Sequence, residues 1–133
     1  MIFKKVKVGK IFLDNRIIVG PMCQYSANEG KPSQWHYKHL LSLSKLGSSL
    51  LMIESTAVNK SGRITKKDLE LSKNSHSRAF SKLLKKLKKK KKIKIGIQIS
   101  HSGRKGSSEL PWIKSNKSLD KKKGGWLTFA PSA

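Results

Sequence analysis

The stretch that decides the fold is Leu50-Leu51-Met52-Ile53-Glu54, four apolar side chains followed by a carboxylate. A short apolar run that ends in polar residues predicts a buried strand. Two further runs of this kind flank it: RIIVG at residues 16–20, which stops at a Gly-Pro pair, and IKIGIQIS at residues 93–100. The sequence therefore predicts three buried strands.

Helical patterns fill both intervals between these strands. Residues 34–46 carry an apolar stripe behind Ser33, a favourable N-cap, and Gly47 suits the left-handed position that follows a helix. In residues 75–91 the apolar positions recur at helical spacing, and lysines cover the outer face and the last turn. Because strands alternate with helices, we expect a parallel α/β fold with right-handed crossovers.

Two segments lie outside this alternation. Residues 4–12 alternate apolar and basic side chains around Gly9, which predicts a short β-hairpin before the first strand. From His101 onward the chain is rich in Gly, Ser and Lys, which predicts a long polar loop.

The composition excludes several classes of protein. The 133 residues carry 30 Lys+Arg against 7 Asp+Glu, a formal net charge of +23, and one Cys. A single Cys cannot form an internal disulfide, and no apolar run suits a signal peptide or the roughly 20 residues of a membrane span. We therefore expect a reduced, cytoplasmic protein with no membrane partner. Only four of the cations are Arg, so the charge indicates a Lys-rich solvated surface and no specific nucleic-acid partner.

Ligands of parallel sheets bind beyond the carboxyl ends of the strands, so the residues there are the candidates for function. After the first strand, Cys23 and Tyr25 supply a thiol and a phenol. Glu54 ends the second strand, either as a carboxylate behind a site or as a charge that faces water. Gln98 in the third strand presents an amide donor and acceptor, which suits the edge of a heterocycle. On spacing alone, an inert buried Cys23 and a Gln98 that satisfies backbone groups are the stronger interpretations.

The histidines give no catalytic pattern by themselves. His36 and His39 lie on the first predicted helix with no carboxylate or Cys ligand nearby in the sequence, so we expect packing or surface roles. His101 opens a basic segment that either holds an anion or forms an exposed turn. No metal-ligand spacing surrounds Cys23, and the phosphate-binding and nucleophile-elbow motifs are missing.

Four segments in order resemble the Old Yellow Enzyme family of NAD(P)H:flavin oxidoreductases, and most of all its bacterial subgroup of ene-reductases that carry a Cys near the flavin. The matching text is NRIIVGPMCQYSANEGKPSQWH at residues 15–36, IESTAVNKSGRIT at 53–65, KIGIQISHSGRK at 94–105 and GWLTFAPSA at 125–133. The resemblance implies a TIM (β/α)₈ barrel, of which residues 1–133 would be a single incomplete domain: about three βα units and a bottom hairpin. It also implies non-covalent FMN, NAD(P)H as reductant and reduction of activated C=C bonds in small enone-like substrates.

The resemblance also implies roles for individual residues. Ala57 would contact the flavin ring through its backbone, Gln98 would bind its pyrimidine edge, and Tyr25 would face the substrate. The segment that would line the flavin consists of Gly20, Pro21, Met22 and Cys23, with the thiol tuning the redox potential. No catalytic residue is assigned, because the family's proton donor and substrate-anchoring His pair come later than residue 133. We therefore expect a truncated chain that is inactive alone, with any homo-oligomer belonging to a full-length form.

Two other interpretations stay open. The dihydrouridine synthases are also FMN barrels with a Pro-Met turn after the first strand, and a high positive charge would suit tRNA. A non-enzymatic basic fragment that binds nucleic acid is the third, and its binding would be lost in about 150–200 mM salt.

Overall fold

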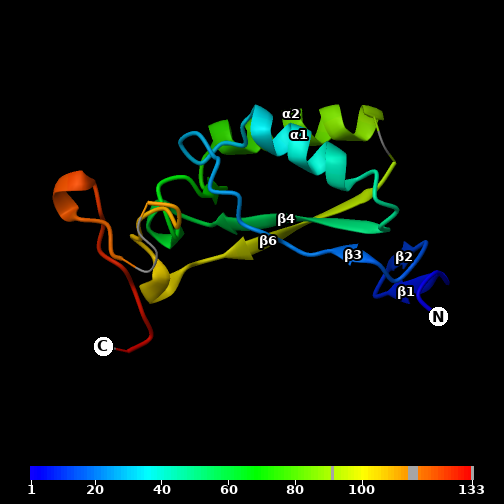
Figure 1. Ribbon diagram of the computed structural model, residues 1–133, viewed down its shortest axis with the longest axis horizontal. Coiled ribbons are helices and arrows are strands. Elements are labelled where there is room, and N and C mark those ends of the chain that lie inside the picture. The colour runs from blue at the N-terminus through cyan, green and yellow to red at the C-terminus, as the bar shows by residue number, and fades with distance from the viewer. Residues whose placement is uncertain (91, 114–116, 133) are drawn as a thin grey trace.

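The computed structural model describes residues 1–90, 92–113 and 117–132 (Figure 1). Its elements in chain order are β1 (Val6–Val8), β2 (Ile11–Leu13), β3 (Ile18–Val19), α1 (Gln34–Leu43), β4 (Leu50–Ala57), the 3₁₀ turn η1 (Lys60–Gly62), β5 (Leu69–Glu70), α2 (Asn74–Lys90), β6 (Lys94–Ser100), and the 3₁₀ turns η2 (Gly103–Lys105) and η3 (Lys121–Lys123). This is the predicted order, with one added strand, β5. Within the described ranges, no helix is both long and apolar enough to cross a membrane.

Strand β4 is the centre of a parallel sheet. Strand β6 pairs along its whole length, from Leu50 opposite Lys94 to Ala57 opposite Ser100. Strand β3 pairs with the first residues of β4, and β5 pairs with its last two. All three pairings are parallel, which confirms the predicted α/β topology. In the described part of the chain, β6 pairs with β4 alone.

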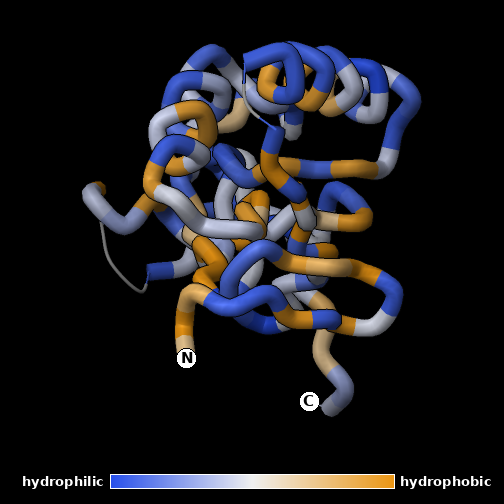
Figure 2. The backbone as a smooth tube through the Cα atoms, turned by 90° about the vertical axis from the view of Figure 1, so that its right-hand side faces the viewer, coloured by the Kyte–Doolittle hydropathy of each residue, from blue (hydrophilic) through white to orange (hydrophobic). Residues whose placement is uncertain are grey.

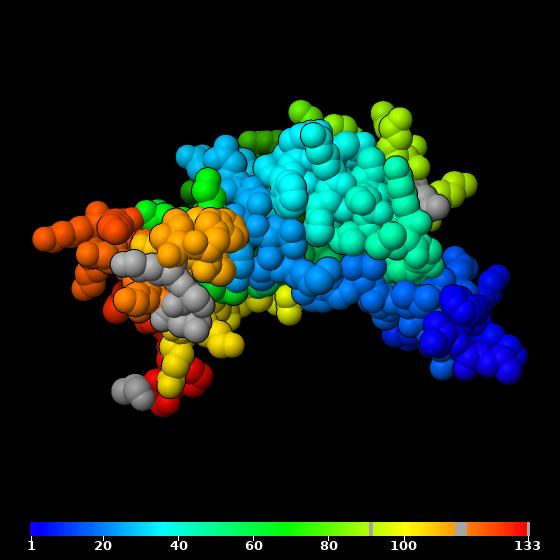
Figure 3. All heavy atoms as spheres, viewed as in Figure 1, coloured from blue at the N-terminus to red at the C-terminus, as the bar shows by residue number. Residues whose placement is uncertain are grey.

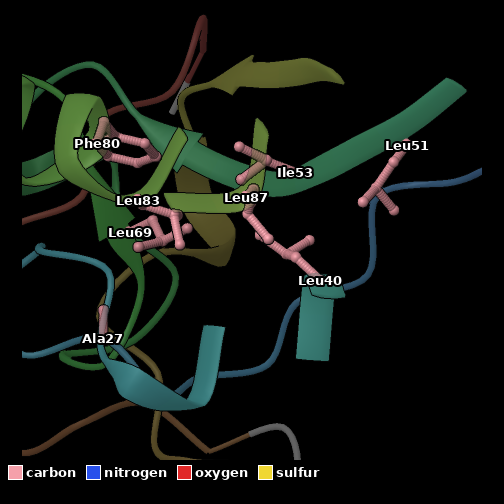
Figure 4. Packing of buried hydrophobic residues seen from close by; sticks show 8 residues of the cluster. All are labelled: Ala27, Leu40, Leu51, Ile53, Leu69, Phe80, Leu83 and Leu87. Carbon is pink, nitrogen blue, oxygen red and sulfur yellow. The ribbon is translucent and has the colours of Figure 1, made fainter. Parts of the chain in front are cut away.

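Both helices cover the same face of this sheet (Figure 1). Leu51 and Ile53 of β4, only 0% and 2% exposed, point to that face because alternate strand residues share a side. The helices contribute Leu40 from α1 and three residues that share one face of α2, Phe80, Leu83 and Leu87 (Figure 4). The spacing of the α2 residues follows the helical period, and hydrophilic positions turn outward along both helices (Figure 2).

The opposite face of the sheet has no helix over it among the described residues. Ile95 and Ile97 of β6 pack against the helix-side core, so Gly96 and Gln98 occupy the other side. Gly96 lies opposite Met52, and a side chain at Gly96 would collide with the Met52 sulfur. We call this surface, which also includes Leu50, the open face.

The two ends of the sheet differ in character. The β1–β2 hairpin stands at the end where β4 and β6 begin, as predicted, with Phe12 and Ile11 more than half exposed. The polar segment that follows β6 gathers at the opposite end, where the parallel strands finish (Figures 1 and 3). Candidate site residues therefore have to be sought at that second end.

Two sequence expectations about the elements need correction. The first predicted strand, residues 16–20, shrinks to Ile18–Val19, and Ile18 is 48% exposed because β3 contacts only the start of β4. The first helix ends at Leu43 rather than at residue 46. At this end the Ser44 hydroxyl donates to the Leu41 carbonyl. Gly47 has the expected left-handed conformation, with φ +82°.

Candidate functional site

A β-bulge shapes the carboxyl end of β4. Ile53 lies opposite Ile97 and Thr56 opposite Ile99, so Glu54 and Ser55 together face the single residue Gln98. An extra residue in one strand bends it and re-aims its side chains. The Ser55 hydroxyl consequently reaches the Ser100 hydroxyl, and the two form a hydrogen bond across the strands. The bulge was not apparent in the sequence, because it depends on pairing with a strand forty residues away.

The segment that follows β3 crosses this end of the sheet without regular structure. Gly20, Pro21 and Met22 are exposed, and a Cβ built on Gly20 would meet nothing within 4 Å. Further along, the Ala27 amide donates to the Lys67 carbonyl at 2.9 Å, which fixes the segment to the loop before β5. This leaves a narrow, open strip of backbone beside the strand ends.

Cys23 is half-buried within this segment and is held by its neighbours. The Ser55 backbone and the Tyr25 side chain lie next to its sulfur. Burial raises the pKa of the Cys23 thiol, the nearby charges of Asp68 and Glu54 raise it further, and these two polar neighbours oppose the change. The thiol is therefore neutral near pH 7, which is the form that is inert as a nucleophile.

Tyr25 takes a conformation that tyrosine rarely adopts. Its φ of +47° lies in the left-handed region, which costs a residue with a Cβ roughly 1–2 kcal/mol. The ring meets Trp112 edge to face, with centroids 6.0 Å apart and planes at 66°. Burial, followed by the charges around it, raises the pKa of the phenol. The strained backbone thus places a neutral phenol beside Cys23. The Trp112 ring, from the loop after β6, packs against this phenol.

Glu54 is a buried carboxylate behind this segment, which settles the alternative that the sequence left open. Its side chain is 6% exposed, and Oε1 accepts the Gln24 amide at 3.1 Å. Oε2 lies 3.7 Å from Nε2 of His36, which is 2% exposed on α1. The burial of His36 agrees with the packing role expected for it, but the sequence spacing did not indicate the carboxylate beside it. The partner lies on the next strand, and the first turn of α1 brings the ring to it.

Gln98 and Ala57 differ in their exposure and in whether their polar groups already take part in hydrogen bonds. None of the side-chain hydrogen bonds among the described residues involves the exposed Gln98 amide, so it does not serve to satisfy backbone groups there. Ala57 is 2% exposed and its carbonyl accepts the Leu71 amide at 2.8 Å. The β4–β6 register places both residues at the same end of the sheet, Gln98 opposite the bulge and Ala57 two residues beyond it.

The loop between β4 and β5 supplies two residues that sequence reasoning missed. Asp68 accepts hydrogen bonds from the Ile64 amide at 2.8 Å and the Thr65 hydroxyl at 2.6 Å, while burial raises the pKa of its carboxyl. Arg63 lies 3.5 Å from a Glu70 oxygen and 5.4 Å from the centre of the Trp126 ring. The Thr-x-x-Asp spacing is a local turn signal that could have identified Asp68.

His101 lies in an exposed turn, where its contacts are with its own loop and with Gly62. Its Nδ1 accepts the Gly103 amide at 3.1 Å, and its ring packs against Gly62, where a Cβ would come within 2.8 Å. The first of its two predicted roles, anion binding, has no support in these contacts.

The end of the sheet therefore carries one continuous set of groups: an open backbone strip, a neutral thiol and phenol, and a free amide. The set comes from three segments that are far apart in the sequence. Its members are Gly20, Pro21, Met22, Cys23, Tyr25, Ser55 and Gln98, and we call it the strand-end cluster.

Comparisons with known proteins agree on one family. The model of the NADH:flavin oxidoreductase / NADH oxidase family matches residues 1–121. The chain is 37% identical to the NADH:flavin oxidoreductase FG08077 of Gibberella zeae over 134 aligned positions, which cover 99% of this chain and 32% of that protein. It is 38% identical to the NADPH dehydrogenase of Bacillus subtilis over 110 positions, 81% of this chain and 32% of that protein.

Solved structures agree on the fold. The old yellow enzyme from Trypanosoma cruzi matches with a TM-score of 0.71 and 22% identity, over 99% of this chain and 34% of that one. The Old Yellow Enzyme from Pichia sp. AKU4542 matches with a TM-score of 0.71 and 21% identity, over 80% and 28%. The fold is therefore the expected amino-terminal portion of a TIM barrel. The chain spans about a third, 32%, of the length of the curated relatives it matches.

Proposed function

The chain belongs to the NADH:flavin oxidoreductase / NADH oxidase family, and we propose that it forms the flavin-facing strand ends of an FMN-dependent ene-reductase. The reductant is NAD(P)H, and the substrates are small molecules with an activated C=C bond, such as enones. One observation carries the proposal: the strand-end cluster brings an open backbone strip, a neutral thiol and an unused amide together at the edge where parallel α/β folds bind ligands.

The residues present fit a flavin. A flat ring needs close backbone approach, and the strip from Gly20 to Met22 is exposed with open space at Gly20. The pyrimidine edge of a flavin alternates donors and acceptors, and the Gln98 amide offers one of each. When bound, FMN supplies the hydride chemistry, whereas the protein supplies binding, orientation and electrostatics.

Most members of the cluster, together with Ala57, then have a role. Gly20, Pro21 and Met22 line the ring, and Ala57 contacts it through its backbone. The Cys23 thiol stays protonated beside the ring and tunes its potential as a hydrogen-bonding neutral group. Tyr25 covers the substrate, because its strained backbone and the Trp112 ring fix the phenol at the rim of the cluster.

We also propose that the groups which protonate and anchor the substrate lie outside residues 1–133. Neither His36 nor His101 can replace a substrate-binding His pair, since His36 is buried against Glu54 and His101 accepts the Gly103 amide and packs against Gly62. The chain by itself is expected to show no enone reductase activity.

A chimera tests the proposal. This chain replaces the aligned segment of the Bacillus subtilis NADPH dehydrogenase, to which it is 38% identical. We expect the purified chimera to carry yellow flavin absorbance and to reduce cyclohexenone with NADPH. A folded chimera that binds no FMN would contradict the proposal, and one that modifies tRNA but leaves cyclohexenone unreduced would favour the dihydrouridine synthases instead.

A further inference from the structure

A buried pair of polar side chains lies directly behind the segment that carries Cys23 and Tyr25. We propose that Glu54, oriented by His36, is the positioning residue of this segment, and that its negative charge suppresses thiolate formation at Cys23. That this segment lines a flavin rests on the proposed function. The anchoring of the segment by Glu54 and the effect of Glu54 on the Cys23 thiol are properties of this chain without flavin.

The contacts run from α1 through β4 to the segment that carries Cys23. The Ser33 amide donates to His36 Nδ1 at 3.0 Å. Because Nδ1 is an acceptor, the proton of the neutral ring belongs on Nε2, the nitrogen that faces Glu54. Glu54 Oε2 lies 3.7 Å from that nitrogen, and Oε1 accepts the Gln24 amide at 3.1 Å. One carboxylate oxygen therefore accepts a hydrogen bond and the other faces the imidazole nitrogen, so rotation of the side chain would change both contacts.

The two ring nitrogens of His36 have different roles, because Nδ1 closes the N-terminal capping box of α1 and Nε2 faces Glu54. Its Nε2 is buried and has no hydrogen-bond partner within normal range, which makes the Glu54 oxygen the group at which it is directed. An unpartnered buried nitrogen is unfavourable by about 1–3 kcal/mol, so a ring kept here for packing alone would be a poor choice. The arrangement makes sense if orientation of the carboxylate is what the histidine provides.

The position of the carboxylate explains its effect on Cys23. Glu54 binds the amide of the residue that follows Cys23, and it lies in a site where little water can screen its charge. The groups that face the thiol are Asp68, Glu54 and Tyr25, and the two carboxylates both disfavour a second negative charge. The same pair of carboxylates faces the Tyr25 phenol. Glu54 thus combines two tasks: it anchors the backbone by a hydrogen bond and keeps the neighbouring thiol neutral by its charge.

Alkylation at Cys23, followed by the mass of its peptide, separates these tasks, because the chain has one Cys and its thiolate is the form that reacts with iodoacetamide. The experiment uses the whole 133-residue chain without flavin and measures the alkylation rate between pH 6 and 10. Glu54→Gln keeps an oxygen for the Gln24 amide but removes the charge. We expect the midpoint of its pH profile to fall, with alkylation at pH 7.5 about three- to tenfold faster.

Glu29→Gln is the matched control. Glu29 is an exposed carboxylate in the same segment and takes no part in the pair, so its variant should alkylate at the wild-type rate. An unchanged pH midpoint in a folded Glu54→Gln chain would overturn the inference, since a purely structural glutamate would behave in that way. An equal shift in both variants would also overturn it, because any loss of an acid would then suffice.

Amide hydrogen exchange tests the anchoring in the wild-type chain and does not require that a variant folds. The Gln24 amide should exchange at least tenfold more slowly than that of exposed Met22, and His36→Asn should remove most of this difference. Equal exchange of the two amides in the wild type would refute the anchoring. These results are independent of the flavin: a chimera without FMN refutes the proposed function and leaves them unchanged.

Discussion

The two faces of the sheet are built from the same strands and have different roles. On the helix side, Leu51 and Ile53 are almost fully buried under α1 and α2. On the open side, Met52 packs over Gly96, and Gln98 presents an exposed amide. The helix side is a hydrophobic core that fixes the strands, whereas the chemistry-bearing residues lie on the open face and at its carboxyl end. Stability and function should therefore respond to different substitutions in adjacent positions of one strand.

The largest expected effect comes from neighbours on β4. Leu51→Ala removes a side chain that is 0% exposed and should lower the free energy of unfolding by about 2–5 kcal/mol in urea titrations. Met52→Ala, on the open face, should cost less than half as much, because its side chain is partly exposed. Equal losses would mean that the two faces are covered alike, and the comparison would fail.

The second effect probes the open face itself. Gly96→Ala places a methyl group where the Met52 sulfur lies, and we expect a loss of about 1–3 kcal/mol in the same titrations. The double variant Gly96→Ala with Met52→Ala should recover most of that loss. Failure of the second substitution to compensate would show that Gly96 is needed for its backbone and not for the space it leaves.

A smaller effect links the helix side to the site. Ser33→Ala removes the hydroxyl that meets His36 Nδ1 at 3.0 Å but keeps the backbone amide that donates to the same nitrogen. We expect a loss of about 1 kcal/mol, the usual value for an N-cap, in thermal unfolding. The alkylation profile of Cys23 should stay at the wild-type midpoint, and a shift comparable to that of Glu54→Gln would show that the hydroxyl orients His36.

The smallest effect is a dependence on alkaline pH that arises at the site. The folded state raises the pKa of Cys23 above its ordinary value of 9.0 and that of Tyr25 above 10.0. A raised pKa means that the unfolded chain loses the proton first, so stability is fully present below pH 9 and declines as pH rises through these values. The double variant Cys23→Ala with Tyr25→Phe should lose part of this decline between pH 9 and 11, measured by urea unfolding. An identical decline in both chains would contradict the assignment.

The helix side of the sheet was largely predictable from the sequence, whereas much of the site was not. Apolar runs such as Leu50–Ile53 identified the three main strands because short apolar runs between polar residues favour strands, and helical spacing identified α2 from its apolar stripe. Strand β5 was missed because Leu69 and Glu70 give no periodic signal in two residues. The bulge at Glu54 was missed for a different reason: it depends on pairing with β6.

The site residues divide in the same way. The strand-end rule pointed to Cys23, Tyr25 and Gln98, since position relative to a strand is readable in one dimension. The pairing of His36 with Glu54 was not predictable by spacing, because it depends on how α1 packs against β4 and eighteen positions separate the two residues. Their roles toward a flavin stay predictions.

FMN titration of the chimera tests the central claim, that the open carboxyl end of this sheet is a flavin site, most directly. We expect Gln98→Ala to weaken FMN binding about tenfold, equivalent to about 1.4 kcal/mol, since it removes the amide that would bind the pyrimidine edge. Gln34→Ala, which removes an exposed amide from the start of α1, should leave the dissociation constant unchanged. Equal FMN affinity in both variants, each folded as judged by circular dichroism, would contradict the account.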